Sequence, residues 1–347
     1  MKDYIIVGGG IAAISLAEVL YRQGKTFMLF CQSMQNATSV AGGIYNPVIV
    51  KRLSLPYNAL EHVKFIGPFY SEIESRLTIK VDFPTPLLRR FASVEEQNNW
   101  FEAADKPELS EFISPKVLRT SYEGLDAPYG YGEVLHTGFI DTNQLLESYH
   151  KWLQEIQAVA YENFDYSHLN INNNHVIYKE IEAKHVVFAE GFGIRNNPYF
   201  NFVPLEGTKG ELLTIHSPDL KLESIVNAGI FILPLGNDIY KVGATYEWTD
   251  KTNNPTEAAR VELEEKLQEI ITCDYDVVTH VAGVRPTTKD RKPVIGTHAE
   301  HSNIHILNGL GTRGLMLGPP MAQQLYDYIE NGTAIERAVD VNRFAGN

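Results

Sequence analysis

The feature that most limits how this chain can fold is the glycine loop near its start, Gly8-Gly9-Gly10. A short apolar run, residues 4–7, precedes the loop, and residues 11–23 follow it with apolar side chains at helical spacing. Gly24 has the position of a C-cap glycine, and residues 26–30 are predicted as a second buried strand. This order of strand, glycine loop, helix and strand predicts a βαβ unit at the start of a parallel sheet.

The spacing Gly8-x-Gly10-x-x-Ala13 in this context is typical of a dinucleotide-binding loop, although a purely structural glycine turn is the alternative. Gly8 permits the tight turn, Gly10 lets the backbone approach a pyrophosphate, and Ala13 is small enough for the helix to pack on the sheet. The helix N-terminus would offer free N–H groups to the phosphates. No acidic residue ends the second strand to hold the ribose. Gln32 is expected to bond a ribose hydroxyl there, more weakly than a carboxylate, which disfavours NAD.

The chain of 347 residues exceeds the usual size of a single core, so we expect two domains. Two later apolar segments fit the interior of a parallel sheet, and three segments between them fit antiparallel strands with a turn at 236–238. The nucleotide-type elements thus lie at both ends of the sequence, which predicts a discontinuous dinucleotide domain with an inserted substrate domain and an α/β (α+β overall) fold. The dinucleotide domain is predicted over 1–80, 137–203 and 283–347, and the substrate domain over 81–136 and 204–282. Helices are predicted over 59–77, 144–156, 255–271 and 320–328, parallel strands over 185–189 and 304–307, and antiparallel strands over 210–215, 230–233 and 239–242.

Composition limits the class of protein further. The net charge of −13 disfavours nucleic acid as a partner. The sequence contains no run of 18 apolar residues, so no membrane span is predicted. The chain begins directly with a strand pattern, so no signal peptide is predicted. Only Cys31 and Cys273 occur, which fits a reducing compartment, so we expect a cytoplasmic protein. The eleven His show no metal-ligand spacing, so no metal site is predicted.

Three more segments are rich in small residues and suit a backbone that lies against a flat ligand, although surface turns are the alternative for the first. Residues 37–47 include Thr38, Ser39, Gly42 and Gly43. Residues 188–193 place Gly191 just after an apolar strand. The third segment runs from residue 283 to the last helix and is the richest in glycine. We expect the first two to line a nucleotide site; the residues of the third expected there are Gly309, Gly311, Arg313, Gly314 and Leu315.

These motifs, taken in order along nearly the whole chain, resemble those of the D-amino acid oxidase superfamily of FAD enzymes, closest to glycine oxidase and sarcosine oxidase. They are also similar to the oxidase half of the bifunctional enzyme that matures 5-aminomethyl-type uridines in tRNA. The most specific stretch of the likeness is 283–315. The resemblance implies a Rossmann-like FAD-binding domain with an inserted antiparallel-sheet substrate domain. It also implies FAD as the cofactor, held noncovalently because no Cys or His matches an attachment position.

The resemblance also implies roles for single residues. The 309–314 turn and the helix after it would lie beside the N1–C2=O edge of the flavin, where a helix N-terminus stabilises negative charge. Arg285 would bind the substrate carboxylate through its planar guanidinium, with a structural ion pair as the alternative. Lys241 would lie near flavin N5 and assist the reaction with oxygen, with a surface lysine as the alternative. Phe231 stands where glycine oxidases tend to have a tyrosine, which puts glycine-like substrates in doubt.

The expected reaction is therefore transfer of hydride from the carbon of a small primary or secondary amine, or an amino acid, to flavin N5. The imine would be hydrolysed, and the flavin reoxidised by oxygen or another electron acceptor. A second hypothesis is an FAD-dependent oxidase of a carboxymethylaminomethyl-type uridine in tRNA. A third is a nucleotide-binding sensor that has lost its chemistry. The sequence carries no signal for an oligomeric state.

Overall fold

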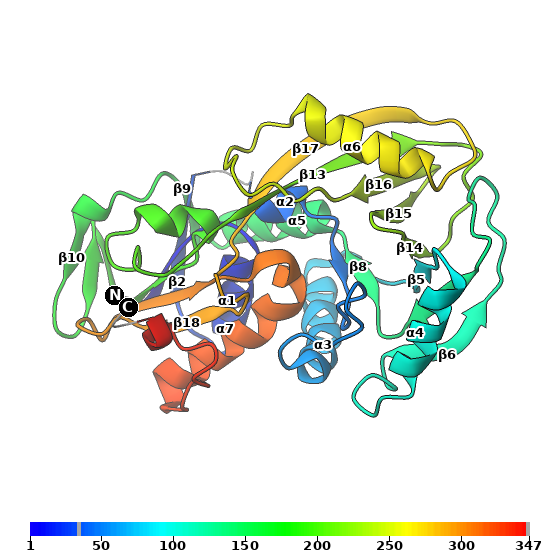
Figure 1. The fold of residues 1–347 in the computed structure, drawn as a ribbon. Helices are drawn as coiled ribbons and strands as arrows, with labels where there is room; N and C mark the ends of the chain where they lie inside the picture. The colour runs from blue at the N-terminus through cyan, green and yellow to red at the C-terminus, as the bar shows by residue number, and fades with distance from the viewer. Residues whose placement is uncertain (33–35, 345–347) are drawn as a thin grey trace.

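The protein, seen here as a computed structural model, is described over residues 1–32 and 36–344 (Figure 1). Its first sheet has the order β10-β11-β12-β1-β2-β9, with β19 also paired to β12 and β18 paired to β19. Strands β9, β2, β1, β12 and β19 run parallel to their neighbours in this set. The strands are β1 (Lys2–Val7), β2 (Phe27–Cys31), β9 (Val159–Tyr161), β10 (Leu169–Ile171), β11 (Val176–Tyr178), β12 (Ile181–Phe188), β18 (Val294–Thr297) and β19 (Ile304–Asn308).

Alternation along β1 explains how both faces of this sheet are covered. Tyr4 and Ile6 belong to a core that the sheet shares with four helices, whereas Ile5 and Val7 belong to a second core on the other face. Figure 1 shows these helices grouped together beside the sheet. They are α1 (Ile11–Arg22), α3 (Ala59–Leu77), α5 (Thr142–Glu155) and α7 (Gly314–Asn331).

The second sheet is antiparallel except where β14 pairs with β5, and its order is β17-β13-β16-β15-β14-β5-β7-β6. One face packs on α6 (Glu257–Gln268), and residues of α4 (Val94–Ala104) share another core with this sheet. The strands are β5 (Leu87–Arg90), β6 (Ile113–Leu118), β7 (Tyr131–Val134), β13 (Thr208–His216), β14 (Ile225–Asn227), β15 (Phe231–Gly236), β16 (Ile239–Gly243) and β17 (Asp276–Arg285).

A small third sheet is formed by β3 (Ile44–Tyr45), β8 (Gly138–Ile140) and β4 (Asp82–Pro84), and a one-turn helix α2 (Ala37–Val40) precedes β3. Short 3-10 helices occupy Tyr166–His168, Gly191–Asn196, Gly311–Arg313 and Val341–Phe344. The combination of a mainly parallel and a mainly antiparallel sheet confirms the predicted fold class. The domain boundaries remain a prediction. Among the described residues, no helix combines the length and apolar character needed to cross a bilayer.

The local signals that the sequence carries explain several elements. Asp141 caps α5 by accepting hydrogen bonds from the N–H groups of Asn143 and Gln144. Asn237 and Asp238 both adopt positive φ in the hairpin between β15 and β16, as a two-residue hairpin turn requires. Helix α3 has the bounds that its apolar spacing predicts.

The predicted start of the last helix at residue 320 was wrong, because α7 begins six residues earlier at Gly314 and contains Pro319 and Pro320. A proline has no N–H, so Pro319 leaves the carbonyl of Leu315 without its helical donor. The hydroxyl of Tyr70 donates to this carbonyl at 2.7 Å and replaces the missing bond. A contact from α3, more than 200 residues away in sequence, thus satisfies one of the two carbonyls that Pro319 and Pro320 leave without a helical donor.

Candidate functional site

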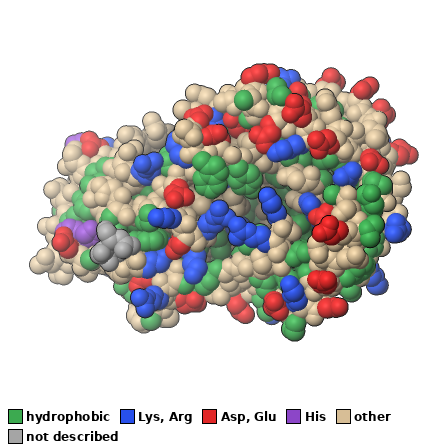
Figure 2. Space-filling model, viewed as in Figure 1, with side chains coloured by type: hydrophobic (Ala, Val, Ile, Leu, Met, Phe, Trp, Pro, Cys, Tyr) green, Lys and Arg blue, Asp and Glu red, His purple; other side chains and the backbone are tan. Residues whose placement is uncertain are grey.

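A cavity of about 590 Å³ lies where the two sheets meet, in the size range of cofactor pockets. One side is formed by the glycine loop after β1, the end of β12 and the turn before α7. The other side is formed by residues of β13, β15, β16 and β17. Figure 2 shows a hollow near the middle of one face of the molecule with Lys and Arg side chains beside it.

The glycine loop needs its glycines for two different reasons. Gly8 has φ +130°, and a Cβ there would lie 2.2 Å from the carbonyl oxygen of Ala189 at the end of β12. Gly10 is the extended N-cap of α1 and has no side chain to cap the helix. Thr38 Oγ1 accepts a hydrogen bond from the N–H of Ile11 at 3.0 Å. The loop therefore presents bare backbone to the cavity.

The N-termini of α1 and α7 lie side by side at this cavity, because small residues let the two helices approach closely. A Cβ at Gly314 would be 3.0 Å from Ile11 Cγ2, and one at Gly318 would be 2.9 Å from Ser15 Oγ. Neither helix has a side-chain cap at its N-terminus. Apart from the Ile11 N–H, which Thr38 accepts, the positive ends of the two helix dipoles make this side of the cavity attractive to negative charge.

Two guanidinium groups, Arg285 at the end of β17 and Arg313 before α7, line the same cavity. Burial lowers the pKa of both, while the hydroxyl of Tyr246 acts in the opposite direction. Within the described chain neither forms an ion pair with a carboxylate. Arg285 Nη1 donates to the carbonyl of Thr245 at 3.3 Å, and its Cζ lies 4.8 Å from the ring centroid of Tyr246. Two such cations favour an anionic ligand, since its charge would compensate their burial.

Gly210 on the neighbouring strand β13 makes room for Arg285. A Cβ at this position would lie 1.9 Å from Arg285 Nη2, inside the guanidinium. Gly210 was not among the predicted site residues, because an isolated glycine in a strand gives no sign of which side chain fills its space.

Lys241 on β16 lies behind the cavity wall rather than in it. Its Nζ donates to the carbonyl of Ala41 at 3.3 Å, next to Gly42, which lines the cavity. Burial lowers its pKa, an effect that Asp141 partly opposes. Lys241 is therefore a half-buried lysine directed at the α2 segment, on the face of the sheet that carries Phe231.

The cavity brings together most of the predicted site residues. Those that line it are Gly8, Gly10, Thr38, Gly42, Gly43, Gly191, Arg285, Gly311, Arg313, Gly314 and Leu315. Five others do not line it. Ala13 is buried in the helix core, and Gln32 is exposed. Ser39 is hydrogen-bonded to Asn36 at the start of α2, and Gly309 has φ +71° in the turn before α7. The fifth is Lys241, whose Nζ donates to the carbonyl of Ala41. Among residues 1–32 and 36–344, no cluster of His, Cys, Asp or Glu could hold a metal ion.

Sequence reasoning missed the part of the wall contributed by the loop between β16 and α6. Tyr246, Lys251 and Asn253 all line the cavity, as does Asn227 at the end of β14. The only sequence signal for this loop is the small-residue run 243–245 before it. Aromatic and polar residues in an irregular loop carry no periodicity that would place them at a site.

Comparison with known proteins identifies the class. The profile of the DAO family, described as FAD dependent oxidoreductase, matches residues 3–328. The chain belongs to this family of FAD-dependent oxidoreductases. Glycine oxidase of Bacillus subtilis (strain 168) is 23% identical over 351 residues, which cover 95% of this chain and 93% of that protein.

Two further similarities extend this picture. The tRNA 5-methylaminomethyl-2-thiouridine biosynthesis bifunctional protein MnmC of Marinobacter nauticus is 23% identical over 385 residues and 99% of this chain, but the chain spans only 58% of its length. The crystal structure of glycine oxidase from Bacillus cereus ATCC 14579 has a TM-score of 0.81 and 19% identity, with 96% of this chain and 98% of that chain covered.

The residues of the cavity fit the cofactor of this family. The glycine loop and the two helix N-termini, whose own N-cap residues supply no side-chain cap, suit a pyrophosphate and the electron-rich edge of a flavin. Side chains at Gly8 or Gly43 would collide with backbone oxygens that shape the wall, Ala189 O and Ile140 O, each at 2.2 Å. No Cys or His is found among the lining residues of the described chain, which suits a noncovalently held FAD.

Proposed function

We propose that this protein oxidises a small amine that carries a carboxylate, using FAD. The observation that carries the proposal is the Arg285 guanidinium, which is half-buried at the cavity without a carboxylate partner in the described chain, with Arg313 on the opposite side of the same cavity. A substrate carboxylate would supply the missing charge through a bidentate pair. The DAO family membership supports the redox chemistry, and glycine oxidase is among its similar proteins.

In this proposal each part of the wall has one task. The pyrophosphate would be held by Gly8, Gly10 and the N-terminus of α1. The flavin edge would be held by the 311–315 turn and the N-terminus of α7. Arg285 binds and orients the substrate carboxylate, and Phe231 supplies an apolar surface where a hydroxyl would make the site more polar. When bound, FAD supplies the acceptor for a hydride from the amine-bearing carbon. Water then hydrolyses the resulting imine to a carbonyl compound and a free amine.

The test is a panel of primary and secondary amines, with and without a carboxylate, incubated with the FAD-loaded protein. Mass analysis follows amine consumption, and a peroxide assay shows whether oxygen is the acceptor. The proposal expects turnover for a subset of amines with a carboxylate close to the nitrogen. Equal turnover of amines with and without a carboxylate would contradict the proposal.

We further propose that Lys241 assists the reaction with oxygen. Replacement of Lys241 by Met is expected to slow reoxidation by oxygen about tenfold or more, because a half-buried cation near the cavity stabilises negative charge that dioxygen acquires. Anaerobic reduction by substrate should change little. Stopped-flow absorbance separates the two half-reactions. An unchanged oxidative rate would leave Lys241 as a strand lysine bonded to Ala41, and would favour an acceptor other than oxygen.

A second candidate function is the oxidation of a carboxymethylaminomethyl-type uridine in tRNA. It is favoured by the match of 99% of this chain to the tRNA-modifying relative, and by the Lys and Arg side chains beside the hollow in Figure 2. The net charge of −13 opposes it. The two functions are distinguished by offering the FAD-loaded protein either undermodified tRNA that carries this base or free amino acids. Flavin bleaching by the tRNA alone would make the tRNA base, and not a small amine, the substrate.

A further inference from the structure

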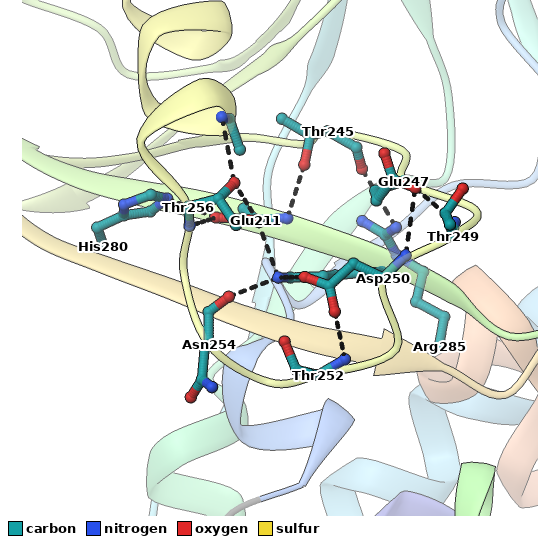
Figure 3. A network of polar contacts seen from close by, with 12 residues as sticks. Glu211, Thr245, Glu247, Thr249, Asp250, Thr252, Asn254, Thr256, His280 and Arg285 are labelled. Carbon is teal, nitrogen blue, oxygen red and sulfur yellow. Dashed lines mark hydrogen bonds and ion pairs between the residues drawn. The ribbon is translucent and has the colours of Figure 1, made fainter.

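A cluster of buried charges lies behind the strand that carries Gly210. Alternation along β13 directs Gly210 and Leu212 to the cavity and Lys209 and Glu211 to the opposite side. Lys209 is completely buried, and Glu211 is 1% exposed. Figure 3 shows the polar contacts that surround Glu211 and the neighbouring loop.

The partners of these two side chains belong mainly to one segment, residues 245–256 between β16 and α6. Lys209 Nζ lies 2.5 Å from Asp250 Oδ2 and also donates to the carbonyl of Asn254. Glu211 accepts hydrogen bonds from the N–H and the hydroxyl of Thr256 at 2.8 and 3.0 Å. The backbones of Lys209 and Glu247 exchange two hydrogen bonds of 2.9 Å. The 245–256 segment is thus held along its length by two residues of β13.

Lys209 is buried in its ion pair with Asp250, whereas the Asp250 side chain is 34% exposed, so the buried cation is the member that most needs its partners. Buried ion pairs lose so much hydration that apolar side chains of similar volume are often as stabilising or more so. What such a pair can do is select one arrangement of the chain, because each charge left without its partner is costly. Lys209 is 3.3 Å from Glu211 as well, so its ammonium group lies between a carboxylate of the strand and one of the segment. His280 Nε2 lies 2.9 Å from the other oxygen of Glu211 without forming a hydrogen bond.

The 245–256 segment also forms part of the site. It carries Tyr246, Lys251 and Asn253 into the cavity wall. The ring of Tyr246 lies over the Arg285 guanidinium although Tyr246 itself is 61% exposed, so the contact is not enforced by burial of the tyrosine. Its position must come from the segment that carries it.

We propose that Lys209 and Asp250 are positioning residues whose ion pair holds the 245–256 segment so that Tyr246 covers Arg285, and that this sets how tightly the site binds a carboxylate. The inference rests on the carboxylate-binding role proposed for Arg285. A cation covered by an aromatic face is shielded from water, so a carboxylate that reaches it meets a less hydrated partner.

The chain contains a reporter for this segment. Of its three tryptophans, Trp248 lies on the segment and is 48% exposed, whereas Trp100 is buried and Trp152 packs under Arg76. Asp250→Asn removes one charge and can keep a hydrogen bond to Lys209. We expect acrylamide quenching of tryptophan fluorescence in the holoenzyme to rise about two- to threefold, because the segment opens to solvent more often. In a Trp248→Phe background the rise should disappear.

The effect on the site is measured with acetate, a carboxylate that has no amine, through the change that it causes in the flavin absorbance. Asp250→Asn should weaken acetate binding about threefold, the size expected for loss of an exposed cation–π arrangement. In a Tyr246→Ala background the same substitution should have no further effect, because the covering ring is already gone. Asp238→Asn is the matched control. Asp238 lies just before β16 and forms a surface ion pair with Lys221, so its replacement should change neither the tryptophan quenching nor the acetate binding.

Unchanged Trp248 quenching in Asp250→Asn, and in Lys209→Met as a second variant, would overturn the proposal. The proposal would also be overturned if Asp250→Asn weakened acetate binding equally in the unaltered protein and in the Tyr246→Ala background. The Lys209–Asp250 pair would then affect binding without acting through Tyr246. Absence of acetate binding in the unaltered protein would instead contradict the proposed function, while the quenching result would still decide whether the ion pair holds the segment.

Discussion

Replacement of Arg285 by Leu is expected to raise the KM for a carboxylate-bearing amine at least about thirtyfold, with little change in FAD content. Loss of one partner of a buried charged pair typically costs about 2–5 kcal/mol in binding. Arg285 has no carboxylate partner in the described chain, so the loss falls on the substrate and not on a structural ion pair. The fold should tolerate the change, since the half-buried Arg285 guanidinium has no carboxylate partner whose charge would be left uncompensated. Steady-state kinetics with the best amine of the panel measure the effect.

Two companion variants make this prediction specific. Gly210→Ala keeps the charge but puts a methyl group where Arg285 Nη2 lies, so it should raise KM by displacing the guanidinium. Arg337→Leu removes an exposed arginine that does not line the cavity, so it should leave the kinetics unchanged. Wild-type KM values for Arg285→Leu with every amine tested would mean that the arginine is structural and that the substrate class is wrong.

Replacement of Gly8 by Ala is expected to abolish stoichiometric FAD binding and to lower the thermal unfolding temperature. The new methyl group would lie 2.2 Å from Ala189 O and 2.7 Å from its carbonyl carbon, and φ +130° disfavours any side chain. Strain of this kind costs on the order of 1–3 kcal/mol for the backbone alone, and the ends of β1 and β12 would also have to separate. Flavin absorbance relative to protein absorbance, together with a thermal melt, measures both effects.

Gly67→Ala is the matched control for this substitution. Gly67 lies inside α3, and a Cβ there would meet no atom within 4 Å. The control should bind FAD normally, because a Cβ at this position lies far from the cavity loop and meets no other element. No gain in helix stability is expected, since Pro68 follows directly and its ring crowds a Cβ on the preceding helical residue. Normal FAD content in Gly8→Ala would show that the glycine loop is not pressed against the end of β12 as the structure has it.

The fold could be predicted from the sequence where the signals are local. The apolar spacing of α3, the Asp141 cap of α5 and the turn residues at Asn237 and Asp238 each act within a few residues. The start of α7 could not be predicted, because the carbonyl freed by Pro319 is satisfied by Tyr70 from another helix. No local pattern reports such a long-range contact.

The candidate site shows the same division. The glycines of the first loop were found because their motif keeps a fixed spacing, whereas the 309–314 turn and Arg285 were assigned through the resemblance to the D-amino acid oxidase superfamily. Tyr246 was missed, since its place depends on the 245–256 segment and on the partners that hold it. Lys209 and Asp250, 41 residues apart, meet only in the folded chain, and the sequence shows them as two ordinary charged residues.

The most direct test of the central claim is anaerobic addition of a carboxylate-bearing amine to the FAD-loaded protein while the visible flavin absorbance is followed. The account predicts that the absorbance bleaches with saturating dependence on the amine, that the carbonyl product appears in equal amount, and that Arg285→Leu shifts the half-saturating concentration upward. Flavin that stays oxidised with every amine of the panel, in a protein that binds FAD stoichiometrically, would contradict the claim that this site oxidises small amines.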